Sequence, residues 1–188
     1  MKRIRTIISI LLLSALLISC GSPGPSDQVV KDIEGFKKIS VDDLLSLMGQ
    51  GEEAMLLSGI ISNDEYFRAF YNKIMDFDYE IIDEAVSEDG NYADVTVTIS
   101  TYPFAATAVD ALTNFTVDAL FGFFDIEGSV INKFMDLNDK SFSETVVIHC
   151  TKTSDGWSTD LHSNTAFVDA ITGGLITGVD AFADFLGY

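Results

Sequence analysis

The chain is short of basic residues. It has 11 Lys and Arg against 29 Asp and Glu, which gives a formal net charge of −18 over 188 residues. A protein with this charge repels phosphate backbones and anionic head groups, so the composition argues against nucleic-acid binding and against electrostatic attachment to a membrane surface. We expect no nucleic-acid partner and interpret the acidity mainly as solvation of the surface.

Cysteine and proline are also scarce, with two Cys and three Pro in the whole chain. Two cysteines cannot build the disulfide framework that holds many small secreted domains together. Aromatic side chains are plentiful, however, with 14 Phe and 6 Tyr, so a disordered acidic stalk is excluded. The length suits one globular domain.

A long apolar run is missing everywhere except near the beginning of the chain. Three cations in residues 2–5 precede an apolar stretch at 7–18 that only Ser9 and Ser14 interrupt. This order is typical of a secretory signal peptide, and the stretch is shorter than the about 20 residues that span a bilayer. We predict a signal peptide at residues 1–19, whose removal leaves 8 basic and 29 acidic residues and a net charge of −21.

The apolar stretch ends in Leu17-Ile18-Ser19-Cys20, which resembles the lipobox of bacterial lipoproteins. In that family the cysteine receives a diacylglyceryl group and becomes the first residue of the mature protein. The resemblance implies that Cys20 is lipidated and that its acyl chains anchor the protein to the outer side of the bacterial cell membrane. A plain secretory leader that happens to contain Cys20 is the alternative.

A run of Gly, Ser and Pro at residues 21–26 predicts a flexible tether, in which the prolines prevent a helix. We assign residues 20–38 to the lipidated cysteine and its tether, and residues 39–188 to a single domain. If Cys20 carries lipid, Cys150 has no partner for an internal disulfide. It ends an alternating apolar segment, which predicts a buried structural cysteine, with a reactive thiol as the alternative.

Periodicity and turn residues predict an α+β domain in which local hairpins form an antiparallel sheet packed on helices. Asp-Gly pairs between β-prone segments predict both hairpins. Three glycines, Gly173, Gly174 and Gly178, predict an interruption or a close backbone approach in the last helix. The expected helices begin at Ser40, Ser62, Phe104 (running to about Met135) and residue 163 or 164 (running to Phe182), and the expected strands are 77–86, 92–102, 142–153 and 157–161.

The segment from Tyr79 to Phe104, the long helix after it, and the strand pair that leads through Asp-Gly-Trp to residues 170–175 look like small lipid-anchored domains with a cystatin-like or NTF2-like cone fold. This resemblance implies a curved sheet that wraps a helix and leaves an open, largely apolar cavity. Some members of that superfamily are isomerases or dehydratases that use an Asp base, sometimes with His.

Five residues could form such a catalytic set, and a desolvated carboxylate among them could act as a base. Asp94 and His149, however, alternate with core positions and should point to water. We therefore predict no catalytic residue. The five candidates are Asp78, Asp94, His149, Asp160 and His162.

Oxygen ligands lie near one another in the segments 76–78 and 136–139, but neither segment has the spacing of a calcium loop. His149, Cys150 and His162 lack the paired spacing of zinc sites. We predict no metal and no cofactor. Trp157 is either a binding aromatic at a cavity mouth or a core contact, and we favour the core contact.

These observations lead to three hypotheses. The first is a non-enzymatic, membrane-anchored extracytoplasmic domain that binds an apolar ligand or another envelope protein. The second is an isomerase or dehydratase with an Asp/His pair inside the cone. The third is an assembly module that forms a homodimer through the sheet face.

Overall fold

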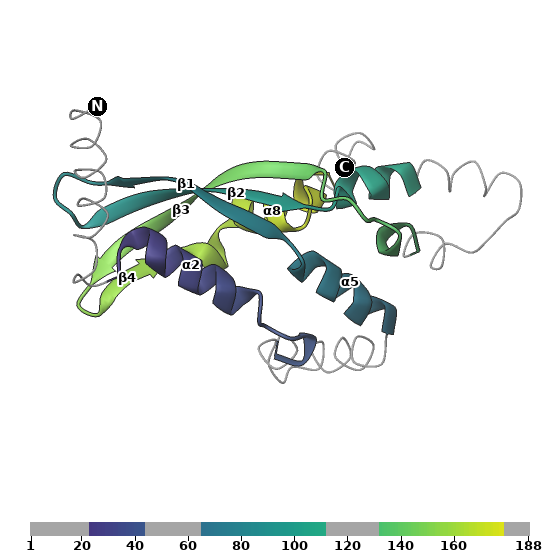
Figure 1. Ribbon diagram of the computed structural model, residues 1–188, viewed down its shortest axis with the longest axis horizontal. Helices are drawn as coiled ribbons and strands as arrows, with labels where there is room; N and C mark the ends of the chain where they lie inside the picture. The colour runs from purple at the N-terminus through teal and green to yellow at the C-terminus, as the bar shows by residue number, and fades with distance from the viewer. Residues whose placement is uncertain (1–22, 44–64, 112–131, 179–188) are drawn as a thin grey trace, which may run out of the picture.

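The computed structural model describes residues 23–43, 65–111 and 132–178 and has an α+β architecture (Figure 1). Its centre is an open four-stranded antiparallel sheet of strand order β1-β2-β3-β4, not closed into a barrel, with helices packed on it. The predicted fold class is confirmed at this level. The strands are β1 (Asp78–Val86), β2 (Tyr92–Thr101), β3 (Phe142–Thr153) and β4 (Gly156–Thr159).

Both predicted hairpins are present, and each turns at its glycine. Gly90 has φ 69° and Gly156 has φ 126°, conformations that cost glycine little because it lacks Cβ. In the first turn the Asp89 carboxylate accepts hydrogen bonds from the Ser87 hydroxyl and the Asn91 N–H. The last strand is shorter than predicted, because a 3-10 helix, η1 (Leu161–Ser163), begins directly after Asp160.

Alternation along the two central strands gives the sheet one dry face. Val95 and Val97 of β2 lie opposite Ile148 and Val146 of β3, and all four are buried. Cys150 continues this row with 1% of its surface exposed, so the predicted structural cysteine is confirmed. Burial raises the pKa of its thiol to about 11, which keeps the thiol protonated and unreactive.

The prediction of a flexible tether at residues 20–38 is wrong at residues 25–36, which form helix α2 (Pro25–Phe36). Pro25 does not prevent the helix, because the first turn does not need its missing N–H group. The Asp27 carboxylate accepts a hydrogen bond from the Gly24 N–H, 3.0 Å away. Val29 and Ile33 are fully buried in the core, so the folded domain includes α2.

Helix α2 crosses the dry face of the sheet antiparallel to β1. At its start, the Ser26 N–H donates to the Glu84 carboxylate near the end of β1, at 2.9 Å. At its end, the Lys37 ammonium donates to the Phe77 carbonyl just before β1, at 2.6 Å. The helix therefore begins at the end of the sheet that carries the two hairpin turns, called the turn end below (Figure 1).

Helix α8 (Thr165–Ile171) packs beside α2 against the same face, and its predicted start is confirmed. The Asn164 side chain caps it by accepting a hydrogen bond from the Phe167 N–H at 3.0 Å. The predicted interruption is confirmed: α8 ends at Ile171, Gly173 and Gly174 with φ 61° and 79° lie in a turn at 172–174, and the chain is helical again at 175–178. The last four residues of the predicted helix, 179–182, lie outside the described part.

The other helical predictions are tested only in part. Ser40 and Asp43 exchange capping hydrogen bonds at the predicted first helix, whose continuation lies outside the described residues. Helix α5 (Glu65–Met75) matches the second. The predicted long helix is helical at 104–111 and 132–135, and its middle lies outside the described residues. Within the ranges that the structure describes, no helix has the length and apolar character needed to cross a bilayer.

Candidate functional site

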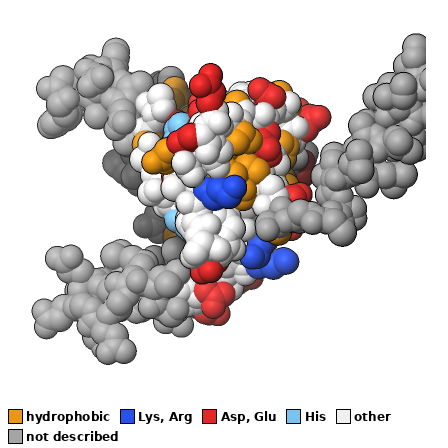
Figure 2. Space-filling model, turned by 90° about the vertical axis from the view of Figure 1, so that its left-hand side faces the viewer, with side chains coloured by type: hydrophobic (Ala, Val, Ile, Leu, Met, Phe, Trp, Pro, Cys, Tyr) orange, Lys and Arg blue, Asp and Glu red, His pale blue; other side chains and the backbone are white. Residues whose placement is uncertain are grey.

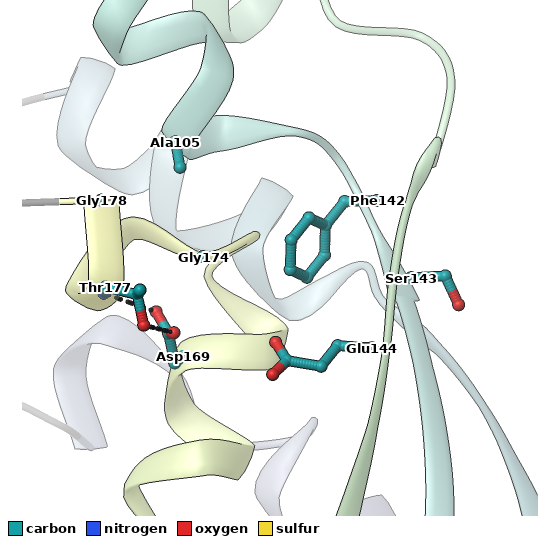
Figure 3. Close-up of a pocket in the computed structure, with 8 residues that line it drawn as sticks. All are labelled: Ala105, Phe142, Ser143, Glu144, Asp169, Gly174, Thr177 and Gly178. Carbon is teal, nitrogen blue, oxygen red and sulfur yellow. Dashed lines mark hydrogen bonds between the residues drawn. The ribbon is translucent and has the colours of Figure 1, made fainter. Parts of the chain in front are cut away.

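A shallow, open pocket of about 440 Å³ lies at the end of the sheet opposite the hairpin turns (Figure 3). Three segments meet there: the start of β3, the first turn of the helical stretch 104–111, and the residues that follow α8. Most of the exposed surface inside it is apolar. The pocket is lined by Ala105, Phe142, Ser143, Glu144, Asp169, Gly174, Thr177 and Gly178.

Glycines allow the segment after α8 to lie this close to residues 102–105. A Cβ on Gly173 would lie 2.1 Å from the Tyr102 carbonyl oxygen, and the Gly173 carbonyl accepts a hydrogen bond from the Ala105 N–H. The predicted close backbone approach is therefore confirmed. Side chains at Gly174 and Gly178 would project toward Phe142 and Ala105 respectively, so their absence helps to keep the pocket open.

Asp169 holds the pocket wall in shape. Its side chain accepts hydrogen bonds from the Ile176 and Thr177 N–H groups, at 2.8 and 3.2 Å, and from the Thr177 hydroxyl. The Asp169 carboxylate is thus engaged by the helical residues 175–178 that follow the turn after α8, as Figure 3 shows for Thr177. Asp169 was not among the predicted site residues. The sequence offers one indication of it, an acidic residue among the apolar residues of the last predicted helix.

Among the described residues, Glu144 is the ionisable group of the pocket for which no partner is found. It lies opposite Ile99 in the inward-facing row of β3, between Phe142 and Val146. Within the described part of the chain, its carboxylate has no hydrogen-bond or ion-pair partner, and Figure 3 shows it pointing across the pocket. Because this half-buried carboxylate carries a negative charge beside the Phe142 ring, the site is favourable for a positive group that also has an apolar part. Glu144 was not among the predicted site residues, although it interrupts the alternation of apolar residues along β3.

Asp94 and His149 lie on the wet face of the sheet, as predicted. They are cross-strand neighbours, and His149 Nδ1 lies 2.7 Å from Asp94 Oδ1. The hydrogen bond to Asp94 raises the pKa of His149 above its usual value of 6.5. Asp160 lies beside this pair, because its carboxylate accepts a hydrogen bond from the His149 N–H at 3.0 Å.

The remaining two candidates lie elsewhere. The Asp78 carboxylate pairs with the Lys140 ammonium at 3.0 Å, and the same ammonium contacts Asp76 at 3.0 Å. The His162 ring packs beside Phe36, with ring centroids 6.0 Å apart. The five sequence candidates therefore occupy three separate places, and none of them lines the pocket.

The metal candidates are engaged in other contacts or do not converge. In the segments the structure describes, no three His, Cys, Asp or Glu side chains come close enough to hold a metal ion. Asp76 and Asp78 share Lys140 instead. Trp157 packs against the core, as predicted, with the Lys152 ammonium 5.7 Å from its ring centroid. Cys20 lies outside the described residues.

Comparison of the chain with known proteins finds no matching family model, no matching curated protein and no matching solved structure.

Proposed function

We propose that this chain is an extracytoplasmic protein, anchored to the bacterial cell membrane through lipidated Cys20, whose domain binds a small, mainly apolar ligand without catalysing a reaction. The leader and the lipobox-like residues 17–20 support the location. The single observation that carries the binding role is the open, largely apolar pocket at the end of the sheet away from the turns. Binding sites for small molecules are commonly concave and apolar with a few placed polar groups.

Glu144 specifies the polar part of this ligand. Its unpartnered carboxylate at the pocket and the net charge of −18 both favour a cation over an anion. Apolar contacts would come from Phe142 and Ala105. The ligand we propose is therefore an amine with a short apolar chain, whose ammonium group pairs with Glu144 while the chain covers the Phe142 ring.

A cystatin-like or NTF2-like cone remains part of this proposal. The antiparallel sheet with α2 and α8 on one face supports it. In such a cone, the pocket would correspond to one opening of the space between sheet and helices.

An acid–base enzyme is the second candidate, because Asp94 and His149 form a close pair. A general base must lie within hydrogen-bond reach of a bound substrate. This pair lies on the open sheet face, with 58% and 64% of its side chains exposed, and outside the pocket. The geometry therefore favours binding over acid–base catalysis.

The binding proposal is tested by titrating the isotope-labelled protein with hexylammonium, hexanol and hexanoate and following backbone amide shifts by NMR. We expect shifts at Phe142, Glu144 and Gly174, with hexylammonium binding most tightly and hexanoate least. Glu144→Gln should abolish the preference for the amine but leave the weaker binding of hexanol, because only the charge is removed.

Two variants of one helix supply the control. Ala105→Leu places a larger side chain inside the pocket and should abolish binding of all three probes, whereas Ala106→Leu changes an exposed neighbour and should leave binding unchanged. Thermal unfolding checks that both variants fold. Absence of shifts at the pocket with every probe, or equal binding by the two folded variants, would refute the binding role.

A further inference from the structure

The position of α2 determines where the proposed membrane anchor joins the folded domain. Gly24 directly precedes the helix, and Ser26 is hydrogen-bonded through both its N–H and its hydroxyl to Glu84, near the end of β1. The buried residues Val29 and Ile33 hold the rest of α2 against the sheet. The chain therefore enters the domain at the turn end of the sheet.

The connection from Cys20 to this point is short. Cys20 and Gly24 are four residues apart in the sequence. An extended chain covers at most about 3.6 Å per residue, so the connection spans no more than about 14 Å. A flexible tether that continued to residue 38 would have reached about 65 Å and would have left the domain free to tumble. Folding of α2 removes that freedom.

We propose that the turn end of the sheet is the surface of this protein that faces the bilayer, and that the pocket faces away from it. This inference rests on the proposed lipidation of Cys20. The surface consists of the two hairpin turns, residues 87–91 and 154–155, with the adjoining side chains of Val86 and Tyr92. Strands of about ten residues rise about 3.3 Å per residue, so the pocket lies about 30 Å farther from the membrane.

The chemistry of the turn end suits zwitterionic phospholipids. Figure 2 looks onto this end, where hydrophobic side chains lie among acidic ones and a few basic ones. Val86 and Tyr92 are 49% and 59% exposed and line a shallow hollow of about 220 Å³. Tyrosine favours the membrane interface, since its ring is apolar and its hydroxyl is polar. The nearby carboxylates of Glu88 and Asp155 complement the ammonium groups of zwitterionic lipids and disfavour anionic ones.

The orientation is tested with the full lipidated protein, purified from cells and reconstituted into phosphatidylcholine vesicles. A dye is attached to Glu88→Cys at the turn end or to Asp139→Cys at the opposite end, and energy transfer to acceptors on lipid head groups reports its height. The two sites are matched, because both are exposed acids without a hydrogen bond or ion pair in the described structure. Unsubstituted protein, in which Cys150 is buried, gives the background labelling.

We expect the dye at position 88 to lie within about 15 Å of the head groups and the dye at position 139 to lie about 30 Å farther away. Inserting a long Gly-Ser repeat between Ser22 and Pro23 should remove this difference. Equal heights, or a lower height at 139, in protein whose mass shows the diacylglyceryl group would overturn the orientation alone. A mass without that group would instead overturn the proposed anchoring.

Vesicles that also contain phosphatidylglycerol test the lipid preference. Repulsion from the anionic head groups should move the acidic turns away from the membrane and so weaken energy transfer at position 88. Added salt should reverse this change, because it screens the repulsion. A stronger transfer in anionic vesicles would contradict the proposed chemistry of the surface.

Discussion

A single cross-strand contact controls the ionisation of His149. The register of β2 and β3 places Asp94 directly opposite His149, and their side chains meet at 2.7 Å. Because the contact favours the protonated imidazole, the pKa of His149 is higher in the folded chain than its usual value of 6.5. The contact therefore stabilises the fold below pH 6.5, and this contribution is lost as pH rises through the folded-state pKa.

Replacing Asp94 with Asn should lower the pKa of His149 toward its usual value, because the charged partner is lost. NMR titration of the ring protons measures this pKa directly. Asp155→Asn, at the exposed second hairpin turn, is the control and should leave it unchanged. We expect only a small effect on stability, since His149 is largely exposed and water screens the pair. An unaltered pKa in Asp94→Asn would show that the contact does not persist in solution.

At the scale of whole elements, α2 is the segment whose role differs most from its sequence pattern. It follows a Gly-Ser-Pro run and has only 12 residues, a length at which isolated helices are marginal in water. Its stability comes from the burial of Val29 and Ile33 and from polar contacts with the sheet, such as the 2.6 Å hydrogen bond from the Thr159 hydroxyl to Asp32.

Truncating Ile33 to Ala should lower the free energy of unfolding by about 2–5 kcal/mol, because the substitution leaves a cavity in the core. Urea denaturation followed by circular dichroism measures the change. Lys31→Ala, on the exposed face of the same helix, should alter stability by no more than about 0.5 kcal/mol. Equal stability of the two variants would mean that α2 is a tether after all, and the inferred orientation would fail with it.

At the scale of the whole molecule, excess negative charge opposes compaction. Ion pairs such as Lys140 with Asp76 and Asp78 offset this repulsion locally. The net charge of −18 nevertheless leaves most carboxylates without a basic residue to neutralise them.

Added salt should therefore stabilise the domain. Raising the ionic strength from about 0.01 M to about 0.1 M shortens the screening length from about 30 Å to about 10 Å, which weakens long-range repulsion more than close pairs. The midpoint of thermal unfolding should rise over this interval for NaCl and KCl alike. A falling midpoint would show instead that ion pairs dominate the electrostatic free energy of the fold.

The sequence by itself determined the features that depend on neighbours along the chain. Asp-Gly pairs produce both hairpin turns because glycine adopts positive φ at little cost, and Asn164 begins α8 because its side chain caps the helix. Alternation placed Cys150 on the buried face for the same local reason.

Only the tertiary structure decided what depends on distant partners. Pro25 and the glycines before it predict a linker. A helix forms there instead, because the sheet provides a surface against which α2 buries Val29 and Ile33. The candidate site likewise arises where β3 meets the segments around Ala105 and Gly174. Contacts between segments that are distant in the sequence depend on strand register and packing. The spacing of residues along the chain does not predict either of these.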